Sequence, residues 1–207
     1  GSPGGSAPAT LTGTGQTPAN VVAGTTSLDF MTVVIGASST VRSYTLTNTG
    51  QATSAAVGLS ASGSTEFVRQ TGAGGDCVPG TTTLAGGASC TVRFVFTPTT
   101  AGARSGTSTW SAGAQNASVA LTGTGQTASG VSASPASLAF GAITLGSSSA
   151  VVSYVLTNNG GATAPVLTLT NTGSDFAQQT GQANDCVPGT TALAGRATGH
   201  PRLVFTP

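Results

Sequence analysis

Three cysteines are the residues of this chain whose type and spacing most directly suggest chemistry. Cys77 and Cys90 bracket a short loop, and Cys186 stands in the same sequence context as Cys77. In an exported protein the first two would pair, and closing a loop of about 14 residues is worth roughly 3 kcal/mol. In a cytosolic protein they would be two free, buried thiols. Because Gly199 occupies the expected partner position of Cys186, we predict a Cys77–Cys90 disulfide and an unpaired thiol at Cys186.

The sequence has few residues that could support catalysis or bind a metal ion. A nucleophile needs a neighbouring base, and His200 is the only histidine. The acidic residues are scattered over predicted turns and strand ends: Asp29, Glu66, Asp76, Asp175 and Asp185. Cys77, Cys90 and Asp76 lack the spaced histidine or second cysteine pair of a zinc site. We therefore predict no enzyme activity, no catalytic, cofactor-binding or metal-binding residues, and no cofactor.

The composition is unusually poor in charge. Charged residues make up 5% of the chain, against about 25% in ordinary soluble domains. All six basic residues are arginine and the net charge is +1, so no basic cluster predicts a nucleic-acid partner. No apolar run approaches the roughly 20 residues of a membrane span. GC-rich codons favour alanine, glycine and arginine over lysine, so the composition predicts a high-GC bacterium as the source.

The chain repeats itself. Residues 11–17 (Leu-Thr-Gly-Thr-Gly-Gln-Thr) return as residues 121–127, and residues 76–82 return as residues 185–191. A repeat of about 110 residues has the size of a domain. We expect residues 1–20 to be the last strand of a preceding repeat plus a linker, residues 21–126 to be a complete repeat, and residues 127–207 to be a second repeat lacking its last two strands.

Each repeat reads as short alternating runs without helical periodicity. The predicted strands of the two repeats centre on Leu28 and Phe30 (Leu138 and Phe140), Tyr44 (Tyr154), Val57 and Leu59 (Leu167 and Leu169), Phe67 (Phe176), and Phe96 (Phe205), with further runs at 107–111 and 119–122 in the first repeat alone. About seven strands per repeat indicate tandem immunoglobulin-like antiparallel β-sandwiches, the second truncated. Linkers are expected at 16–26 and 126–136.

Several motifs, in the order in which they occur, resemble a known family. Residues 46–50 (Leu-Thr-Asn-Thr-Gly), 89–98 (Ser-Cys-Thr-Val-Arg-Phe-Val-Phe-Thr-Pro) and 119–125 (Val-Ala-Leu-Thr-Gly-Thr-Gly) resemble the repeat of bacterial choice-of-anchor D proteins. That repeat is similar to the immunoglobulin-like group of ASH, HYDIN and major-sperm-protein-like domains. The resemblance implies tandem β-sandwiches on exported or surface proteins and supplies no catalytic residues.

Residues 195–202 depart from the pattern of the first repeat. The second cysteine is missing there, and Pro201 stands where the inward-facing Val92 is expected. A proline removes one N–H from a strand ladder. The sequence leaves two explanations open, genuine divergence and an error in the sequence itself.

Three further sequence features could suggest a binding or modification site but also have ordinary structural explanations. The Gly-Thr-Gly-Gln segments at 13–16 and 123–126 look like phosphate loops, but no helix follows them, so we interpret them as inter-domain turns. The sequon at 116–118 (Asn-Ala-Ser) is expected to be a hairpin turn. Every aromatic residue except Trp110 falls at a repeated, core-type position, which leaves Trp110 as the one candidate for contact with a sugar.

These observations predict a non-enzymatic structural or adhesive module of an exported or cell-surface bacterial protein. It would act as a stalk or protein-interaction spacer in the extracellular space, on the cell surface or in the periplasm. Its partners would be other domains of the array, proteins or surface glycans, with no nucleic acid and no membrane span. The alternative is an accessory carbohydrate-binding module of a secreted hydrolase.

The truncated second repeat carries one more expectation. Without counterparts of residues 105–111 and 118–124 it should have an open sheet edge and an uncovered patch around Tyr154, Leu156, Leu203 and Phe205. Open edges capture strands of matching pattern. Residues 9–13 have the closing-strand sequence, so we expect them to fill such a gap between molecules.

Overall fold

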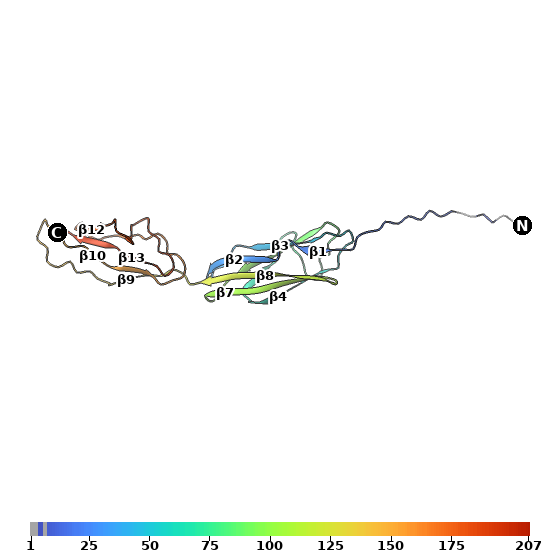
Figure 1. Cartoon of the computed structure of the whole chain (residues 1–207), viewed down its shortest axis with the longest axis horizontal. Coiled ribbons are helices and arrows are strands. Elements are labelled where there is room, and N and C mark those ends of the chain that lie inside the picture. The colour runs from blue at the N-terminus through green and yellow to red at the C-terminus, as the bar shows by residue number, and fades with distance from the viewer. Residues whose placement is uncertain (1–3, 6–7) are drawn as a thin grey trace. The chain divides into compact units, whose positions relative to one another are not determined.

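The computed structural model describes residues 4–5 and 8–207 and is all-β in that part (Figure 1). It contains strands β1 to β14, and its described residues include no helix long and apolar enough to cross a membrane. The expected class, an all-β protein, is therefore confirmed. Of the tail expected at residues 1–20, residues 1–3 and 6–7 lie outside the described part, and the others form no strand.

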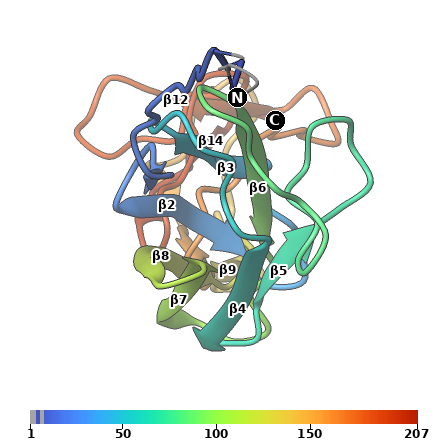
Figure 2. The ribbon, with the colours of Figure 1, turned by 90° about the vertical axis from the view of Figure 1, so that its right-hand side faces the viewer.

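Residues 21–126 form two four-stranded sheets (Figures 1 and 2). The first has the order β1-β3-β6-β5, with strands Val21–Ala23, Arg42–Asn48, Ser89–Phe96 and Phe67–Gln70. The second has the order β2-β8-β7-β4, with strands Ser27–Val34, Gln115–Gln126, Gly102–Ala112 and Val57–Gly63. These orders correspond to the A-B-E-D and G-F-C sheets of immunoglobulin domains, with the first strand divided between both sheets. The immunoglobulin-like β-sandwich predicted for this part of the chain is thus observed.

The hydrophobic core lies between these two sheets. Along β6 the side chains alternate, so that Cys90, Val92, Phe94 and Phe96 are buried while their neighbours are partly exposed. Residues from the facing sheet meet them: the ring centroids of Phe30 and Phe96 are 6.3 Å apart. Period-two alternation of this kind is typical of a strand with one face on the core.

Strand β2 runs parallel to β8. The amide of Ala120 donates to the carbonyl of Thr26, and the amide of Ile35 donates to the carbonyl of Gln126, both at 2.9 Å. The residue numbers therefore increase in the same direction along both strands. Each of the two edge strands of this sheet, β2 and β4, has a single neighbour, β8 and β7 respectively.

Residues 131–205 form two three-stranded sheets. One has the order β13-β11-β9, with strands Thr198–Gly199, Val155–Asn158 and Val131–Ser134. The other has the order β10-β14-β12, with strands Val152–Ser153, Arg202–Phe205 and Phe176–Gln179. Together, these two small sheets correspond to the single β1-β3-β6-β5 sheet of the first repeat. The register agrees, since Val131 pairs with Asn158 as Val21 pairs with Asn48. Pro201 separates β13 from β14, in agreement with the N–H that a proline removes.

The strands predicted around Leu138 and Phe140 and around Leu167 and Leu169 are not formed. Their counterparts β2 and β4 pair only with β8 and β7. Among the described residues beyond 126, no strand corresponds to β7 or β8. Without those neighbours the two segments have no ladder to join, although their apolar pattern is that of strands.

Other corrections concern the predicted turns and linkers. The expected linkers 16–26 and 126–136 contain β1 and β9, short edge strands. The segments 116–118 and 123–126, interpreted as turns, both lie within β8. The hairpin turn precedes the sequon, at residues 113–114, where Gly113 has a φ of 67°. A positive φ of this size favours glycine.

The domain boundaries remain predictions. By proximity, the described residues fall into two compact units, one made of segments up to Asp29 and of 40–95 and 105–122, the other of 30–39, 96–104 and 123–207. Segments 30–39 and 96–104 belong to strands and loops of the first two sheets. The grouping therefore does not coincide with the border that we predicted at residue 126.

Candidate functional site

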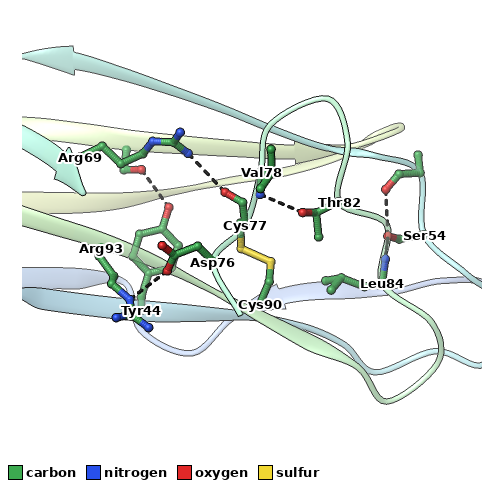
Figure 3. The surroundings of a disulfide bond; sticks show 12 residues. Tyr44, Ser54, Arg69, Asp76, Cys77, Val78, Thr82, Leu84, Cys90 and Arg93 are labelled. Carbon is green, nitrogen blue, oxygen red and sulfur yellow. Dashed lines mark hydrogen bonds and ion pairs between the residues drawn. A yellow bond between two sulfur atoms is a disulfide. The ribbon is translucent and has the colours of Figure 1, made fainter. Parts of the chain in front are cut away.

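The candidate site is the loop of residues 71–88, which connects β5 to β6 and which we call the disulfide loop (Figure 3). A disulfide joins Cys77 in this loop to Cys90 in β6, with the Cα atoms 5.0 Å apart. Both cysteines are buried. The amide of Cys77 also donates to the carbonyl of Thr91 at 2.9 Å. The loop is thus held against β6 by a covalent bond and by backbone pairing.

An ion pair holds the same segment. The Arg93 Nε lies 2.9 Å from Asp76 Oδ1, and the Asp76 side chain is only 7% exposed. The other carboxylate oxygen of Asp76 accepts the amide of Ala73 at 2.9 Å. Buried carboxylates are retained when they are paired in this way. Asp76 therefore fixes the loop against β6.

Arg69, on β5, is a contact that the sequence did not reveal. Its Nη1 donates to the carbonyl of Cys77 at 3.4 Å. In the second repeat Gln178 stands in its place and donates through Nε2 to the carbonyl of Cys186 at 2.6 Å. A charged and a neutral side chain thus make the same bond. The shared property is a donor of suitable length, which indicates a structural role.

A surface hollow adjoins this loop, lined by Arg69 and residues 71–78. Most of its wall is glycine, alanine and threonine. Its two charged residues are Arg69 and Asp76, and each is already bonded within the fold. Ligand sites present polar groups that converge on the ligand. Here the charged groups bond the loop itself.

The corresponding loop of the second repeat has no disulfide. Cys186 is a free, fully buried thiol, and a Cβ at Gly199 would overlap its sulfur. Burial, and then the negative charge of Asp185, raise the pKa of the Cys186 thiol. Because the thiolate is the reactive form, the thiol is a poor nucleophile at neutral pH. Asp185 in turn pairs with Arg202, at 3.5 Å between Oδ2 and Nη1.

The structure brings Asp185, Cys186 and His200 to one place, which the sequence did not predict. Asp185 and His200 form a parallel backbone bridge, and the amide of Cys186 donates to the carbonyl of His200 at 3.4 Å. Gly199 and Pro201, on either side of His200, are both buried, and Gly199 lies against the Cys186 sulfur. Strand alternation therefore directs the His200 ring to the opposite face from the thiol. Cys186 and His200 therefore do not form a pair of nucleophile and general base.

The remaining acids stay apart from this group. Asp29 lies on β2 and is exposed, Glu66 precedes β5 and accepts the hydroxyl of Ser64 at 3.2 Å, and Asp175 precedes β12 and is exposed. Within residues 4–5 and 8–207, no group of three or more His, Cys, Asp and Glu side chains could hold a metal ion. Asp29, Glu66 and Asp175 thus belong to different strands and loops.

Trp110, the candidate for sugar contact, lies on β7 and is only 3% exposed. Its indole Nε1 has no hydrogen-bond partner among the described residues. A sugar stacks on an exposed aromatic face, and a ring buried to this extent offers none. The indole packs in the interior of the first sandwich.

Comparison with known proteins yields distant likenesses. No protein-family model matches the chain, and no curated protein does. Solved structures similar to it include an ASH/PapD-like domain of human CEP192, at 18% identity and a TM-score of 0.36, covering 52% of this chain and 86% of that one. Another similar structure is the secreted serine protease VesC of Vibrio cholerae, at 16% identity and a TM-score of 0.36. The match covers 86% of this chain and 45% of the protease chain.

A third similar structure is the class 5 fimbriae chaperone CfaA, at 12% identity and a TM-score of 0.33, covering 86% of this chain and 84% of that one. With all three TM-scores below 0.5, the fold assignment rests on the strand order and on the packing of the sheets. The names of these proteins carry no conclusion about the activity of this chain.

Proposed function

We propose that this chain is a non-enzymatic β-sandwich module of an exported bacterial protein, acting as a spacer or stalk between other domains. The observation that carries the proposal is the use made of each residue that could have done chemistry. Cys77, Cys90 and Asp76 bind the disulfide loop to β6. The second repeat keeps the ion pair and a buried Cys186 at the same places.

Export is supported by the disulfide. Disulfides persist in oxidising compartments and are rare in the bacterial cytosol. The low content of charged residues agrees with a spacer role, because few ionic groups are present to attract a charged ligand. The carbohydrate-binding alternative has lost its aromatic candidate, since the Trp110 ring is buried.

The thiol count of the exported chain tests the proposal. The full chain would be secreted with a bacterial export signal, denatured, alkylated without reductant and weighed intact. We expect one alkyl group per chain, on Cys186, and three after reduction. Three alkyl groups without reductant would contradict export as a disulfide-linked protein. Binding of the secreted chain to a glycan array, measured on a separate native sample, would favour the carbohydrate-binding alternative over the spacer.

A further inference from the structure

The first sandwich has a hollow at one side, between the edge strand β1 and the hairpin of β7 and β8. Residues 20–23, 25 and 26 line it on one side, and Trp110 and residues 114–118 line it on the other. Its volume of about 500 Å³ lies within the range of about 300–1,000 Å³ that is typical of ligand sites. None of the lining residues is charged, and most carry a hydroxyl, an amide or a small apolar group.

The hollow exists because the chain changes sheets there. Strand β1 pairs with β3, and β2 pairs with β8 only from the bond between the Ala120 amide and the Thr26 carbonyl onward. Strand β8 begins five residues earlier, at Gln115. Backbone groups of successive residues point to alternate edges of a strand, so those of Asn116 and Ser118 share the edge of Ala120. Among the described residues, nothing bonds the backbone groups of Asn116 and Ser118 at that edge.

The inner face of the hairpin is uncovered at the same place. Val119 and Leu121 point into the core, and strand alternation puts Ala117 on their face, yet Ala117 is exposed. Trp110 lines the hollow with an indole Nε1 that is buried and has no hydrogen-bond partner among the described residues. A buried indole N–H usually has a partner. The hollow therefore combines an uncovered strand face with an unpaired donor.

The opposite wall of the hollow already binds an amide group. The Gln115 side chain accepts the amide of Val21 at 2.8 Å through Oε1 and donates to the carbonyl of Ala19 at 2.7 Å through Nε2. A side-chain amide offers the same donor and acceptor as a peptide group. The backbone groups of Ala23 face the same edge as those of Val21 and have no partner there among the described residues. Both walls thus present free peptide groups to the hollow.

We propose that this hollow binds an extended, uncharged peptide segment of a partner protein, added beside β8 in line with β2. The segment is extended because the free groups of Asn116 and Ser118 recur at every second residue, as strand addition requires. It is uncharged because a charge entering the hollow would lose water without meeting an opposite charge. Its inward-facing side chain would lie against Ala117, and a serine or threonine hydroxyl there would accept the N–H of Trp110.

Trp110 reports on its own site, because it is the only tryptophan of the chain. The probe is the peptide acetyl-Ala-Val-Thr-Val-Ala-amide, titrated into the full chain. We expect a saturable change in tryptophan fluorescence and a shift of the single indole N–H resonance in the nuclear magnetic resonance spectrum. The same peptide with methylated backbone amides should bind at least about tenfold more weakly, because it cannot donate to the edge of β8. With valine in place of its threonine, the indole resonance should move less.

Two alanine substitutions on β8 place the binding in the hollow. Ala117→Leu should weaken peptide binding about tenfold or more, because the larger side chain fills the space of the inward-facing residue. Ala120→Leu is the matched control, since Ala120 is exposed on the opposite face of the strand and does not line the hollow. Circular dichroism should show both variants folded. A peptide that does not bind would overturn the proposal. So would binding that Ala117→Leu or amide methylation leaves unchanged, or binding that does not move the indole resonance.

Discussion

Gly199 lies directly against the buried sulfur of Cys186, in the place that Cys90 occupies beside Cys77 in the first repeat. A side chain at position 199 therefore has one favourable identity. Cysteine would bond the sulfur, whereas any other side chain would collide with it. The two repeats thus present the same loop with and without its covalent link.

We expect Gly199→Cys to form a disulfide with Cys186 in an oxidised sample. The closed loop should raise the free energy of unfolding by about 3 kcal/mol, the value for a loop of about 15 residues. Intact mass after alkylation reports the bond, and urea denaturation reports the stability. Gly199→Ser is the matched control, which should destabilise because its Cβ overlaps the Cys186 sulfur without bonding it. Two alkylated cysteines in the oxidised variant would show the prediction to be wrong.

Removal of the native bond should have the opposite effect. The double variant Cys77→Ala with Cys90→Ala should lose about 3 kcal/mol of unfolding free energy. Backbone pairing at Thr91 and the Asp76–Arg93 ion pair remain, so we expect a folded protein with a lower denaturation midpoint. Circular dichroism during urea denaturation measures this difference. An unchanged midpoint would mean that the disulfide loop unfolds independently of the sheets.

The hydroxyl of Tyr44 offers a matched pair of substitutions. It bonds the buried hydroxyl of Ser108 at 2.8 Å, whereas no described residue bonds the Tyr154 hydroxyl. Tyr44→Phe should therefore cost about 1–3 kcal/mol, because Ser108 is left buried without its partner. Tyr154→Phe should change stability by less than about 0.5 kcal/mol. Equal effects of the two substitutions in thermal denaturation would contradict this assignment.

Stability should fall in alkaline solution. Burial raises the pKa of the Cys186 thiol in the folded chain, while the unfolded thiol titrates near about 8.5. Below that pH both states are protonated and the contribution to stability is complete. Above it the unfolded chain releases the proton first, so the contribution is lost as the pH rises toward the folded pKa.

Urea denaturation at several pH values between about 7 and 10 measures this slope, a range that lies around the pKa of a free thiol. Cys186→Ala removes the titrating group and should make the slope shallower between about 8 and 10. Tyr44 and Tyr154, whose pKa values are also raised by burial, contribute only above about 10. An identical slope with and without Cys186 would assign the alkaline loss to other groups.

The fold of the first repeat was largely predictable because its strands alternate strongly. β3, β6 and the inward half of β8 follow from their apolar residues at every second position. β1 and β9 were missed, because a three- or four-residue edge strand carries little pattern of its own. They are recognised only by their neighbours, as when Val131 pairs with Asn158.

The opposite error occurred at Phe140 and Leu167, where a strand pattern exists without a strand. A single segment does not reveal whether its pairing partner is present, and these two depend on counterparts of β8 and β7. Asn48 shows a different limit. Its side chain is fully buried, and its Nδ2 donates to the carbonyls of Ala52 and Leu84, contacts that no local sequence pattern predicts. Such a hub joins segments that are distant in the sequence.

The parallel pairing of β2 with β8 has a mechanical consequence. These strands lie near the beginning and the end of the first sandwich, and tension applied along the chain would pull them in opposite directions. Because they run parallel, the force would load the bonds at Thr26 and Ile35 together, in shear, rather than opening them one after another. Forced unfolding is governed by the unfolding rate, and shear raises the barrier to that step. In the spacer role that we propose, this sandwich would therefore resist a pulling force more strongly than one whose terminal strands separate bond by bond.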